Sequence, residues 1–487
     1  MLDATVVNVA LPTIGRHLDA SLGELQWTVT GYTLSLAGLI LLGGSLGDRV
    51  GRRRVFLIGV IWFALASALC GAAPDIDVLI GARVLEGVGG ALLTPGSLAI
   101  IQATFAPEDR PRAVGAWAGL GGVASAAGPI VGGWLVEAAG WRWVFLLNLP
   151  LAVAVIVVTV RHVPETRDPT ARGGFDISGA ALAALGLAGI TYALIGAPEH
   201  TSLTGVVVAG VLGIGAAVAF VVLEHRRTYH PARVEPMLPL DVFASRQFSV
   251  INIITFLVYA AFGGLLFLLV LQLQVVSGFS PIGAGLALLP VTVITLALSA
   301  RSGALAQKIG PRWPMTAGLV LLAVGMLLMS RIGPHASYAG DVLPAVVVYG
   351  FGLSLTVAPL TATVLASADV RHAGVASGVN NAVARAASLL AVAALPAAVG
   401  LDAASYHQPP RFNHGFDRAT LACAVILLAA AGLAALLVDN NVLTSAGKQA
   451  KPEAQVSCSV GAPPLLPPPT RTSAAGTGAS ATGQGQG

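Results

Sequence analysis

Charged residues are scarce in this sequence. Asp, Glu, Lys and Arg make up 10% of the 487 residues, whereas 55% of the residues are hydrophobic. Soluble globular domains carry roughly a quarter charged residues, and the mean hydropathy of this chain is +0.80. The shortage of charge therefore excludes a soluble globular protein, and we expect lipid to solvate most of the chain.

Patterns that hold cofactors or metals are also missing. The three cysteines, Cys70, Cys423 and Cys458, lie far apart in the sequence, which argues against a disulfide framework and against a metal site. The sequence contains no G-x-x-x-x-G-K-[ST] loop, so we expect no ATP hydrolysis. No haem or redox pattern is present. We therefore predict no cofactor, no enzymatic activity and no nucleic-acid partner, which leaves an ion gradient as the energy source.

Long apolar runs recur along most of the chain. A membrane-spanning helix needs about 20 apolar residues, and a backbone in lipid must satisfy its own hydrogen bonds, so such runs are helices rather than open strands. The sequence thus predicts an all-α polytopic membrane protein with about fourteen helices, the first of them short. The expected spans are 1–14, 27–46, 55–73, 78–102, 113–137, 143–160, 176–196, 204–223, 248–271, 281–300, 314–331, 341–363, 374–400 and 419–438.

An internal repeat suggests how these helices are grouped. Residues 44–53 read GSLGDRVGRR and residues 303–312 read GALAQKIGPR, and each stretch follows the second helix of its half. Repeated halves are typical of secondary transporters, which bind cargo near the midplane. We expect two six-helix halves with two additional helices between them. The expected regions are 1–160 (N-terminal half), 161–247 (linker with two extra helices), 248–438 (C-terminal half) and 439–487 (disordered cytoplasmic tail).

The positive charges are distributed unevenly between the two sides of the predicted bundle. When alternate loops are assigned to opposite sides, twenty Lys and Arg share the side of the 47–54 loop and five lie on the other side, with Arg83 and Arg385 inside helices, which accounts for all 27. Positively charged loops stay in the cytoplasm. We therefore expect a multi-pass protein of the cytoplasmic (inner) membrane with both termini in the cytoplasm.

Several motifs then resemble one family. GGSLGDRVGRRR resembles the loop between helices 2 and 3 of the major facilitator superfamily, and LIGARVLEGVGGALLTP resembles its helix 4 signature. AAGPIVGGWL is similar to the helix 5 signature of the antiporters, while LDATVVNVALP and GWRWVFLLNLP resemble the fourteen-helix drug:proton antiporters in particular. The resemblance covers the chain to about residue 438. It implies the major facilitator fold and proton-coupled multidrug efflux.

The loop motif between helices 2 and 3 is expected to act in the conformational change. Its glycines permit a tight turn between helices, and the carboxylate of Asp48 is placed to approach a neighbouring helix N-terminus. The resemblance implies a latch that holds one state; topogenic charge alone is the alternative. Gln307 replaces Asp48 in the second copy, so we expect a weaker latch there. The latch residues are Gly44, Asp48, Arg49, Gly51, Arg52 and Arg53.

The helix 5 motif carries Gly128, Pro129, Gly132 and Gly133. Pro129 bends a helix because it lacks an N–H donor, and small residues four apart allow close helix approach. The resemblance implies a role in the conformational switch, with ordinary tight packing as the alternative. Ala124 stands where the family carries a further glycine.

Charged and polar side chains inside the predicted helices mark a candidate pathway, because such groups are costly in a bilayer. Arg83 and Glu86, three positions apart, share one face of their helix. The resemblance implies that the arginine takes part in proton coupling, whereas the family commonly has glutamine in place of Glu86. The two residues are therefore either a second protonatable site or a neutralising pair. Asn381 and Arg385 are candidates to line a cavity opposite. We read Tyr32 as an anchor at the membrane interface.

Asp3 is the acidic residue of the first helix. A carboxylate near the bilayer centre binds a proton or a cationic substrate but hardly both, and the resemblance implies such a role; hydration near a free N-terminus is the alternative. Fourteen residues make about 21 Å of helix, short of the roughly 30 Å hydrocarbon core. We therefore expect that Met1 is not the native start or that the gene is truncated.

These observations together predict an exporter. We expect proton-coupled outward transport of lipophilic, often cationic drugs or antibiotics by alternating access, in a monomer whose partners are a small-molecule substrate, protons and the lipid bilayer. A dedicated exporter of one metabolite and a sugar or metabolite facilitator or symporter remain alternatives. A non-transporting membrane scaffold has no support in the sequence beyond the tail.

Overall fold

The computed structural model describes residues 2–105, 109–167, 176–198, 202–229, 236–367, 373–402, 405–406 and 408–443, and every structural statement below concerns these residues. Met1–Ser445 forms one compact unit. The predicted tail from 439 onward falls outside the described residues beyond position 443.

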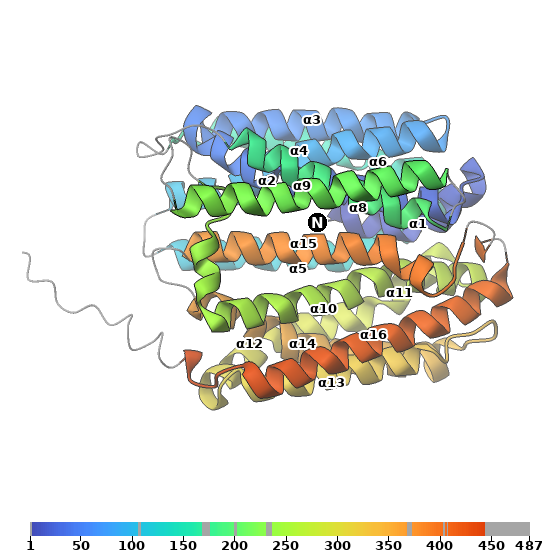
Figure 1. The fold of residues 1–487 in the computed structure, drawn as a ribbon. Helices are drawn as coiled ribbons and strands as arrows, with labels where there is room; N and C mark the ends of the chain where they lie inside the picture. Colours follow the sequence, from blue (N-terminus) through green and yellow to red (C-terminus); the bar gives the residue numbers. More distant parts are fainter. Residues whose placement is uncertain are drawn as a thin grey trace, which may run out of the picture. The chain divides into compact units, whose positions relative to one another are not determined.

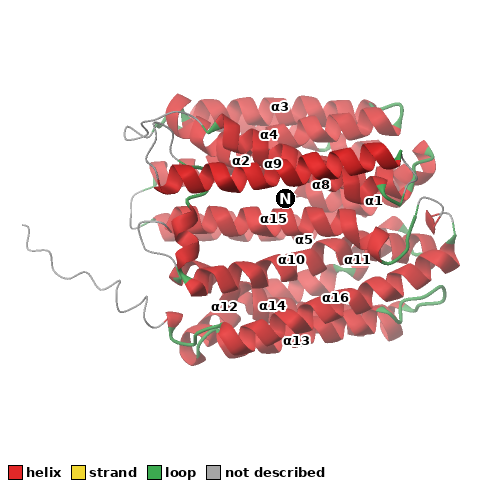
Figure 2. Ribbon diagram, in the orientation of Figure 1, coloured by secondary structure: helices red, strands yellow, loops and turns green. Residues whose placement is uncertain are grey.

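Helices account for nearly all of the described chain, and none of the described residues forms a strand (Figure 2). Every span predicted from the sequence falls on a helix. The elements in chain order are α1 (Leu2–Leu18), α2 (Leu22–Val50), α3 (Arg52–Ala72), α4 (Ile76–Thr104), α5 (Arg110–Ala138), α6 (Arg142–Leu146), α7 (Asn148–His162), α8 (Ile177–Gly196), α9 (Leu203–Tyr229), η1 (Leu240–Ala244), α10 (Arg246–Leu271), η2 (Gln272–Val276), α11 (Pro281–Ala287), α12 (Leu289–Ile309), α13 (Arg312–Met329), η3 (Tyr338–Val342), α14 (Leu343–Ala366), α15 (Ala373–Ala398) and α16 (Pro409–Leu437).

Local signals explain where several helices begin. At α2, the Ser21 hydroxyl accepts a hydrogen bond from the Glu24 N–H at 3.2 Å, and the Glu24 carboxylate accepts one from the Ser21 N–H at 2.7 Å. This reciprocal capping box satisfies two of the N–H groups that a helix start leaves without partners. Asp75 caps α4 with a single bond, since its carboxylate accepts the Val78 N–H at 2.8 Å.

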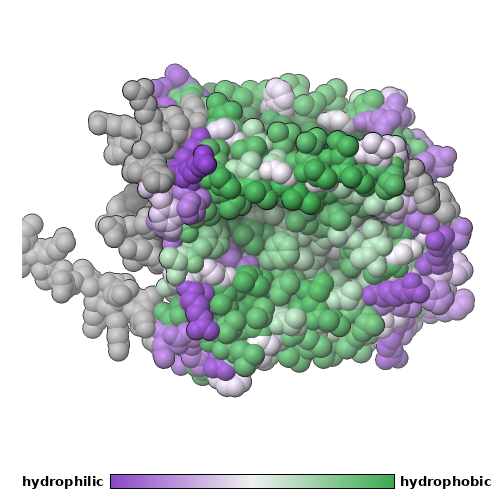
Figure 3. All heavy atoms as spheres, viewed as in Figure 1, coloured by the Kyte–Doolittle hydropathy of each residue, from purple (hydrophilic) through white to green (hydrophobic). Residues whose placement is uncertain are grey.

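The helices fit a membrane protein, because apolar side chains cover the middle of the bundle and hydrophilic ones gather at its two ends (Figure 3). Within the described residues, eleven helical segments are long and apolar enough to cross a membrane, or twelve if α2, bent by 49° near residue 41, counts as one span. Two helices are not among them: α1, which has 17 residues, and α5, which has 29. The count of fourteen spans is therefore not confirmed, although the all-helical polytopic class is.

Helices near in sequence pack together at the two sides of the bundle. Helices α2, α3 and α4 contact one another, and α13 packs against both α14 and α16 (Figure 1). Contacts between these groups run through α1, α5 and α11, and through α15, which touches both α2 and α8. The span that contains α10 is 61% buried whereas α9 is 6% buried. Thus α10 lies inside the bundle and α9 faces lipid. The predicted division at residues 160 and 248 stays a prediction.

Candidate functional site

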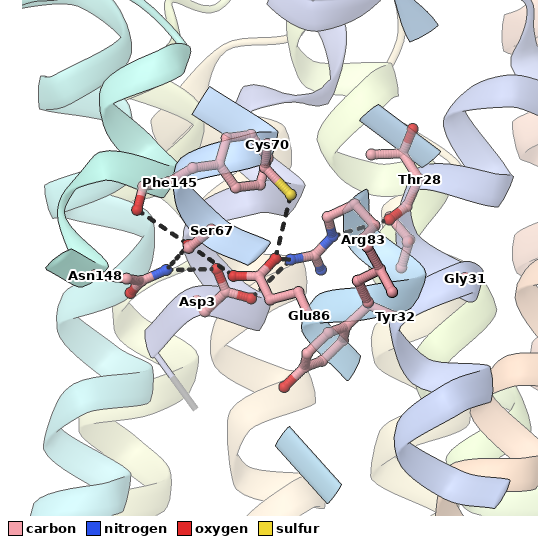
Figure 4. Close-up of polar contacts among 12 residues, drawn as sticks. Asp3, Thr28, Gly31, Tyr32, Ser67, Cys70, Arg83, Glu86, Phe145 and Asn148 are labelled. Carbon is pink, nitrogen blue, oxygen red and sulfur yellow. Dashed lines mark hydrogen bonds and ion pairs between the residues drawn. The ribbon is translucent and has the colours of Figure 1, made fainter. Parts of the chain in front are cut away.

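A buried ion cluster joins the first helix to the fourth. The Arg83 guanidinium on α4 donates to the Asp3 carboxylate on α1 at 2.9 Å and to the Glu86 carboxylate on α4 at 2.6 Å (Figure 4). The side chains of the three residues are 2%, 5% and 0% exposed, respectively. Burial of Asp3 excludes the hydrated reading of this residue in the described structure. One guanidinium thus faces two carboxylates away from water.

Neutral donors fill the remaining positions around the two carboxylates. Asn148, the first residue of α7, donates its amide to Asp3 at 3.1 Å and to the Ser67 hydroxyl at 2.9 Å, and Ser67 donates to Glu86 at 2.7 Å (Figure 4). The Cys70 thiol lies 3.6 Å from the other oxygen of Glu86. Each carboxylate oxygen therefore has a partner. Sequence reasoning missed Ser67 and Asn148, because a lone serine or asparagine in an apolar run carries no functional signal.

The remaining faces of the guanidinium are also occupied. Nε of Arg83 donates to the Thr28 carbonyl oxygen on α2 at 3.1 Å. The Tyr32 ring centroid lies 4.4 Å from the guanidinium carbon and that of Phe145 lies 5.8 Å from it. Such stacking stabilises a buried cation. The reading of Tyr32 as an interface anchor is therefore wrong: α2 turns this side chain inward over Arg83.

The charge balance of this cluster favours a bound proton. Two ionised carboxylates beside one guanidinium leave one net negative charge in a buried site, and an uncompensated buried charge costs several kcal/mol. A proton on Asp3 or Glu86 removes that charge. When the proton leaves, the cluster regains a charge that the surrounding helices must accommodate by moving or by admitting water. The arrangement can therefore convert protonation into a change in helix packing.

The predicted latch has a different acid at its centre. Asp48 pairs with Arg52 at 2.8 Å within the α2–α3 turn and does not cap a neighbouring helix. Instead the Glu165 carboxylate, which follows α7, accepts the backbone N–H groups of Arg53 at 3.1 Å and Arg54 at 3.2 Å. Gly51 has φ +133° and a Cβ there would lie 2.7 Å from the Glu165 carboxylate, so only glycine fits.

The other latch residues lie on α2 and α3 on either side of this turn. Gly44 packs against Pro95 of α4, and Arg49 lies in the last turn of α2. Arg53 donates to the Val160 carbonyl oxygen at 2.9 Å. Sequence reasoning missed Glu165, because it lies 112 residues along the chain from Arg53 and no spacing rule relates the two.

The second copy of the loop repeats this geometry with a neutral residue. Gly310, at the place of Gly51, has φ +86°. The Asn440 side-chain oxygen, which follows α16, accepts the Arg312 N–H at 3.1 Å, as Glu165 accepts that of Arg53. Each half thus caps its third helix with a residue that follows its last helix. The weaker latch that Gln307 predicts for the second copy stays a prediction.

The glycines of the helix 5 motif bring α5 against two other helices. A Cβ at Gly132 would lie 2.9 Å from the Val6 side chain of α1, and one at Gly128 would collide with Thr5. A Cβ at Gly133 would meet Pro281 and Ile282 of α11. α5 therefore packs closely against α1 on one face and α11 on another. This contact links the predicted N-terminal half to the C-terminal half.

A cavity of about 620 Å³ lies beside this contact. Its walls come from α1, α5, α10, α12, α13 and α14 and are largely apolar, with Phe262 and Tyr349 as its aromatic residues. Among the described residues that line it, none carries a charge. Its polar side chains besides Tyr349 are an amide and hydroxyls: Asn8, Thr5, Ser125, Thr292, Thr295 and Ser299. Pockets of this kind suit lipophilic small molecules.

Among the described residues, no hydrogen bond or ion pair joins the candidate residues on α15 to Asp3, Arg83 or Glu86. Asn381 is exposed and donates to the Ser377 carbonyl oxygen at 3.0 Å. Arg385 is half-buried and acts electrostatically on Tyr32 and Tyr259. Neither residue lines the cavity described above. The structure thus brings Asp3, Arg83 and Glu86 together and leaves Asn381 and Arg385 outside.

Several hydrogen bonds connect the two predicted halves at one end of the bundle. The Tyr406 hydroxyl donates to the Pro12 carbonyl oxygen at 3.1 Å, and Gln274 donates to that of Val9 at 2.9 Å. Gln26 reaches the Val392 carbonyl oxygen at 2.5 Å, and Glu137 accepts the Ile282 N–H at 2.9 Å. This end lies opposite the 47–54 turn in chain topology. The bundle is therefore closed at that end.

Comparisons with known proteins agree with this geometry. The profile described as Major Facilitator Superfamily matches residues 1–392. The chain is 34% identical over 398 residues to the tetracenomycin C resistance and export protein of Streptomyces glaucescens, which covers 81% of this chain and 72% of that protein. It is 37% identical over 385 residues to the multidrug resistance protein Stp of Mycobacterium tuberculosis (78% and 70% covered) and 34% identical over 454 residues to the puromycin resistance protein pur8 of Streptomyces alboniger (91% and 89% covered).

Solved structures share the fold at low identity. A bacterial homolog of the human lysosomal transporter Spinster, in an inward-facing and unoccupied conformation, gives a TM-score of 0.64 at 17% identity and covers 91% of this chain and 95% of that chain. The POT family transporter PepTSo gives a TM-score of 0.62 at 16% identity, with 92% and 96% covered. This likeness confirms the fold that the sequence motifs implied.

Proposed function

Because this chain belongs to the Major Facilitator Superfamily, we propose that it exports lipophilic drugs or antibiotics across the cytoplasmic membrane in exchange for protons. Its structural neighbours are transporters, and it is a multi-pass membrane protein. The relatives are named for resistance to, or export of, tetracenomycin C and puromycin and for multidrug resistance. These names support outward movement of antibiotics as the direction and class of cargo.

The observation that carries the proton step is the buried pair of carboxylates that share Arg83. The pairing of Asp3 with Arg83 fixes α1 against α4. A proton on Asp3 weakens that ion pair, whereas a proton on Glu86 leaves Asp3 as the one ionised partner of Arg83 in the cluster. Two packings of α1 and α4 therefore differ in the proton that they hold, which is what an exchanger requires.

Helix α1 provides a physical link from the proton site to the cargo site. Asp3 lies in the ion cluster, while Thr5, Asn8 and Val9 on the same helix line the cavity. At 1.5 Å per residue, about 7.5 Å of helix separates Asp3 from Asn8. Because Gly132 lets α5 pack closely against α1, a displacement of α1 also shifts α5 and the cavity wall. This favours coupling through helix movement over competition for one carboxylate.

The orientation of the chain in the membrane follows from the distribution of Lys and Arg between its two ends. The end closed by the Tyr406 and Gln26 hydrogen bonds is the one with few predicted Lys and Arg, so we assign it to the outside and both termini to the cytoplasm. The described conformation is then closed to the outside. Glu165 and Asn440 hold the cytoplasmic turns, and we assign the latch to them together with the Asp48–Arg52 pair. We treat the transporting unit as a monomer.

The cavity also bears on the alternatives. A sugar site needs many hydrogen-bonding groups, because each buried hydroxyl of the cargo must find a partner. The largely apolar walls fit a lipophilic cargo better. A dedicated exporter of one metabolite uses the same machinery and differs only in a narrow resistance profile.

The test combines cargo and proton measurements. In cells that express the wild-type protein, a fluorescent drug should accumulate less than in control cells, and a protonophore should abolish the difference. Arg83→Ala and Asp3→Asn should each raise accumulation to the control level, because they break the ion cluster. In proteoliposomes, addition of drug should release protons from an acidified lumen. Drug movement without proton counterflow would favour a facilitator, and equal accumulation in all cells would exclude the export proposal.

A further inference from the structure

We propose that the cavity between α1, α5, α10, α12 and α14 takes its cargo in uncharged form, so that the transporter selects neutral lipophilic compounds and rejects organic cations. The inference rests on the export function proposed above and defines its substrate class. It departs from the sequence-based expectation of an often cationic cargo.

The first argument is the chemistry of the wall. Its polar side chains are hydroxyl and amide groups, such as Thr5, Asn8 and Thr292, and none of the described lining residues is ionised. Hydroxyls and amides exchange hydrogen bonds with carbonyl, ether and hydroxyl groups of a neutral molecule. A cation placed there would lose its water without meeting a counter-charge. That desolvation costs several kcal/mol, which apolar contacts do not offset.

The second argument is the state of the interior carboxylates. Asp3 lies on the same helix as the lining residues Thr5 and Asn8, but Asp3 and its cluster partner Glu86 are only 5% and 0% exposed. Arg83 and Asn148 hold the two oxygens of Asp3, while Ser67 and Arg83 hold those of Glu86. With a proton on one carboxylate the cluster balances the charge of Arg83, so a cationic cargo would have to displace either that proton or Arg83. Asp3 and Glu86 are therefore reserved for the proton.

The third argument is an additional positive charge. Arg385 on α15 is half-buried, and no hydrogen bond or ion pair of its guanidinium is found among the described residues. It acts electrostatically on Tyr259 of α10, whose ring lies 6.4 Å from that of Phe262 in the cavity wall. The positive charge of Arg385, which does not itself line the cavity, offers a cationic cargo no counter-charge.

The primary test uses two dyes with one ring system and different charge. Nile red is uncharged, and Nile blue is a cation at neutral pH. In proteoliposomes with a proton gradient, we expect the wild-type protein to move Nile red faster than Nile blue by more than about tenfold, which corresponds to 1.4 kcal/mol of discrimination. Nile blue should not compete with Nile red.

A charge added to the cavity provides the matched variant. Thr292→Glu places a carboxylate in the wall, and Thr292→Gln has nearly the same shape without the charge. We expect Thr292→Glu to gain transport of Nile blue and Thr292→Gln to keep the preference for Nile red. The wild-type measurement stands even where a variant fails to fold.

The outcomes separate this inference from the export proposal. Equal transport of both dyes, or faster transport of Nile blue, would overturn the uncharged-cargo inference and leave proton-driven export intact. A lack of Nile red transport would also overturn it, and the accumulation assay described above would then decide whether export itself fails. Faster transport of Nile red than of Nile blue, with gain of Nile blue transport in Thr292→Glu, would support it.

Discussion

At the scale of single residues, the ion cluster shows how one substitution changes a site. The sequence resemblance implies glutamine where this chain has Glu86, and a glutamine there would leave Asp3 and Arg83 as a balanced pair. Glu86 instead adds a second carboxylate to one guanidinium. Because the added group is buried, its charge must be balanced by a proton or by helix movement. Of the two readings that the sequence left open, this geometry favours a protonatable site.

Glu86→Gln tests that role. The amide keeps hydrogen-bonding capacity toward Ser67 and removes the acid, so we expect a folded exporter that moves fewer protons per cargo molecule. The ratio of proton flux to dye flux in proteoliposomes that contain a pH-sensitive dye measures this. Asp77→Asn, which alters an exposed carboxylate in the first turn of α4, should leave the ratio unchanged. An unaltered ratio in Glu86→Gln would assign Glu86 a purely structural role.

At the scale of helices, close packing at α5 decides which elements move together. The absence of side chains at Gly128 and Gly132 allows α1 to lie against α5, and Gly133 admits α11. Small residues of this kind give membrane helices their closest contacts. The helix 5 motif, which the sequence predicts to act in the conformational switch, therefore also holds together α1 and α5, two of the helices that line the cavity.

Gly132→Leu should disrupt this contact. The added side chain collides with Val6 and pushes α1 away from α5, and overpacking of this kind costs about 1–3 kcal/mol. We expect drug efflux to fall about tenfold or more while the protein still reaches the membrane. Gly81→Leu is the matched control, because a Cβ at Gly81 meets nothing within 4 Å. Similar efflux in both variants would argue against a role for the α1–α5 contact.

At the scale of the whole molecule, several hydrogen bonds join the predicted halves at one end, in addition to the packing of α5 against α11 and of α15 against α2. Tyr406, Gln274, Gln26 and Glu137 each connect one half to the other at the same end. A typical hydrogen bond contributes about 0.5–1.5 kcal/mol net. These four bonds are therefore among the contacts that transport must break in every cycle.

Tyr406→Phe should open this end more often. Loss of the bond to Pro12 shifts the equilibrium by a factor of about 2–10. Spin labels at Asp19→Cys and Gln408→Cys, in a background with Cys458→Ser, report the separation between halves, and we expect a larger population at long distance. Tyr338→Phe, which alters an exposed tyrosine, is the control. An unchanged distance distribution would show that Tyr406 does not hold the closed state.

The sequence by itself determined the class and the order of the helices, because a bilayer demands long apolar helical segments wherever the chain crosses it. It also named Asp3, Arg83 and Glu86, since charge within such segments is rare enough to read directly. It also identified the two loop copies. Only the folded chain shows that Glu165 caps α3 and that Asn440 caps α13, the helices that follow the two loops.

Tertiary structure decided everything that depends on which helices meet. Ser67, Asn148 and Tyr32 join the ion cluster from three different helices, and no spacing along the chain relates them. The uncharged wall of the cavity arises in the same way, because it is assembled from segments that lie up to about 350 residues apart. The apolar pattern predicts that a residue lies inside the membrane, but only the packing of the helices decides which neighbours it contacts.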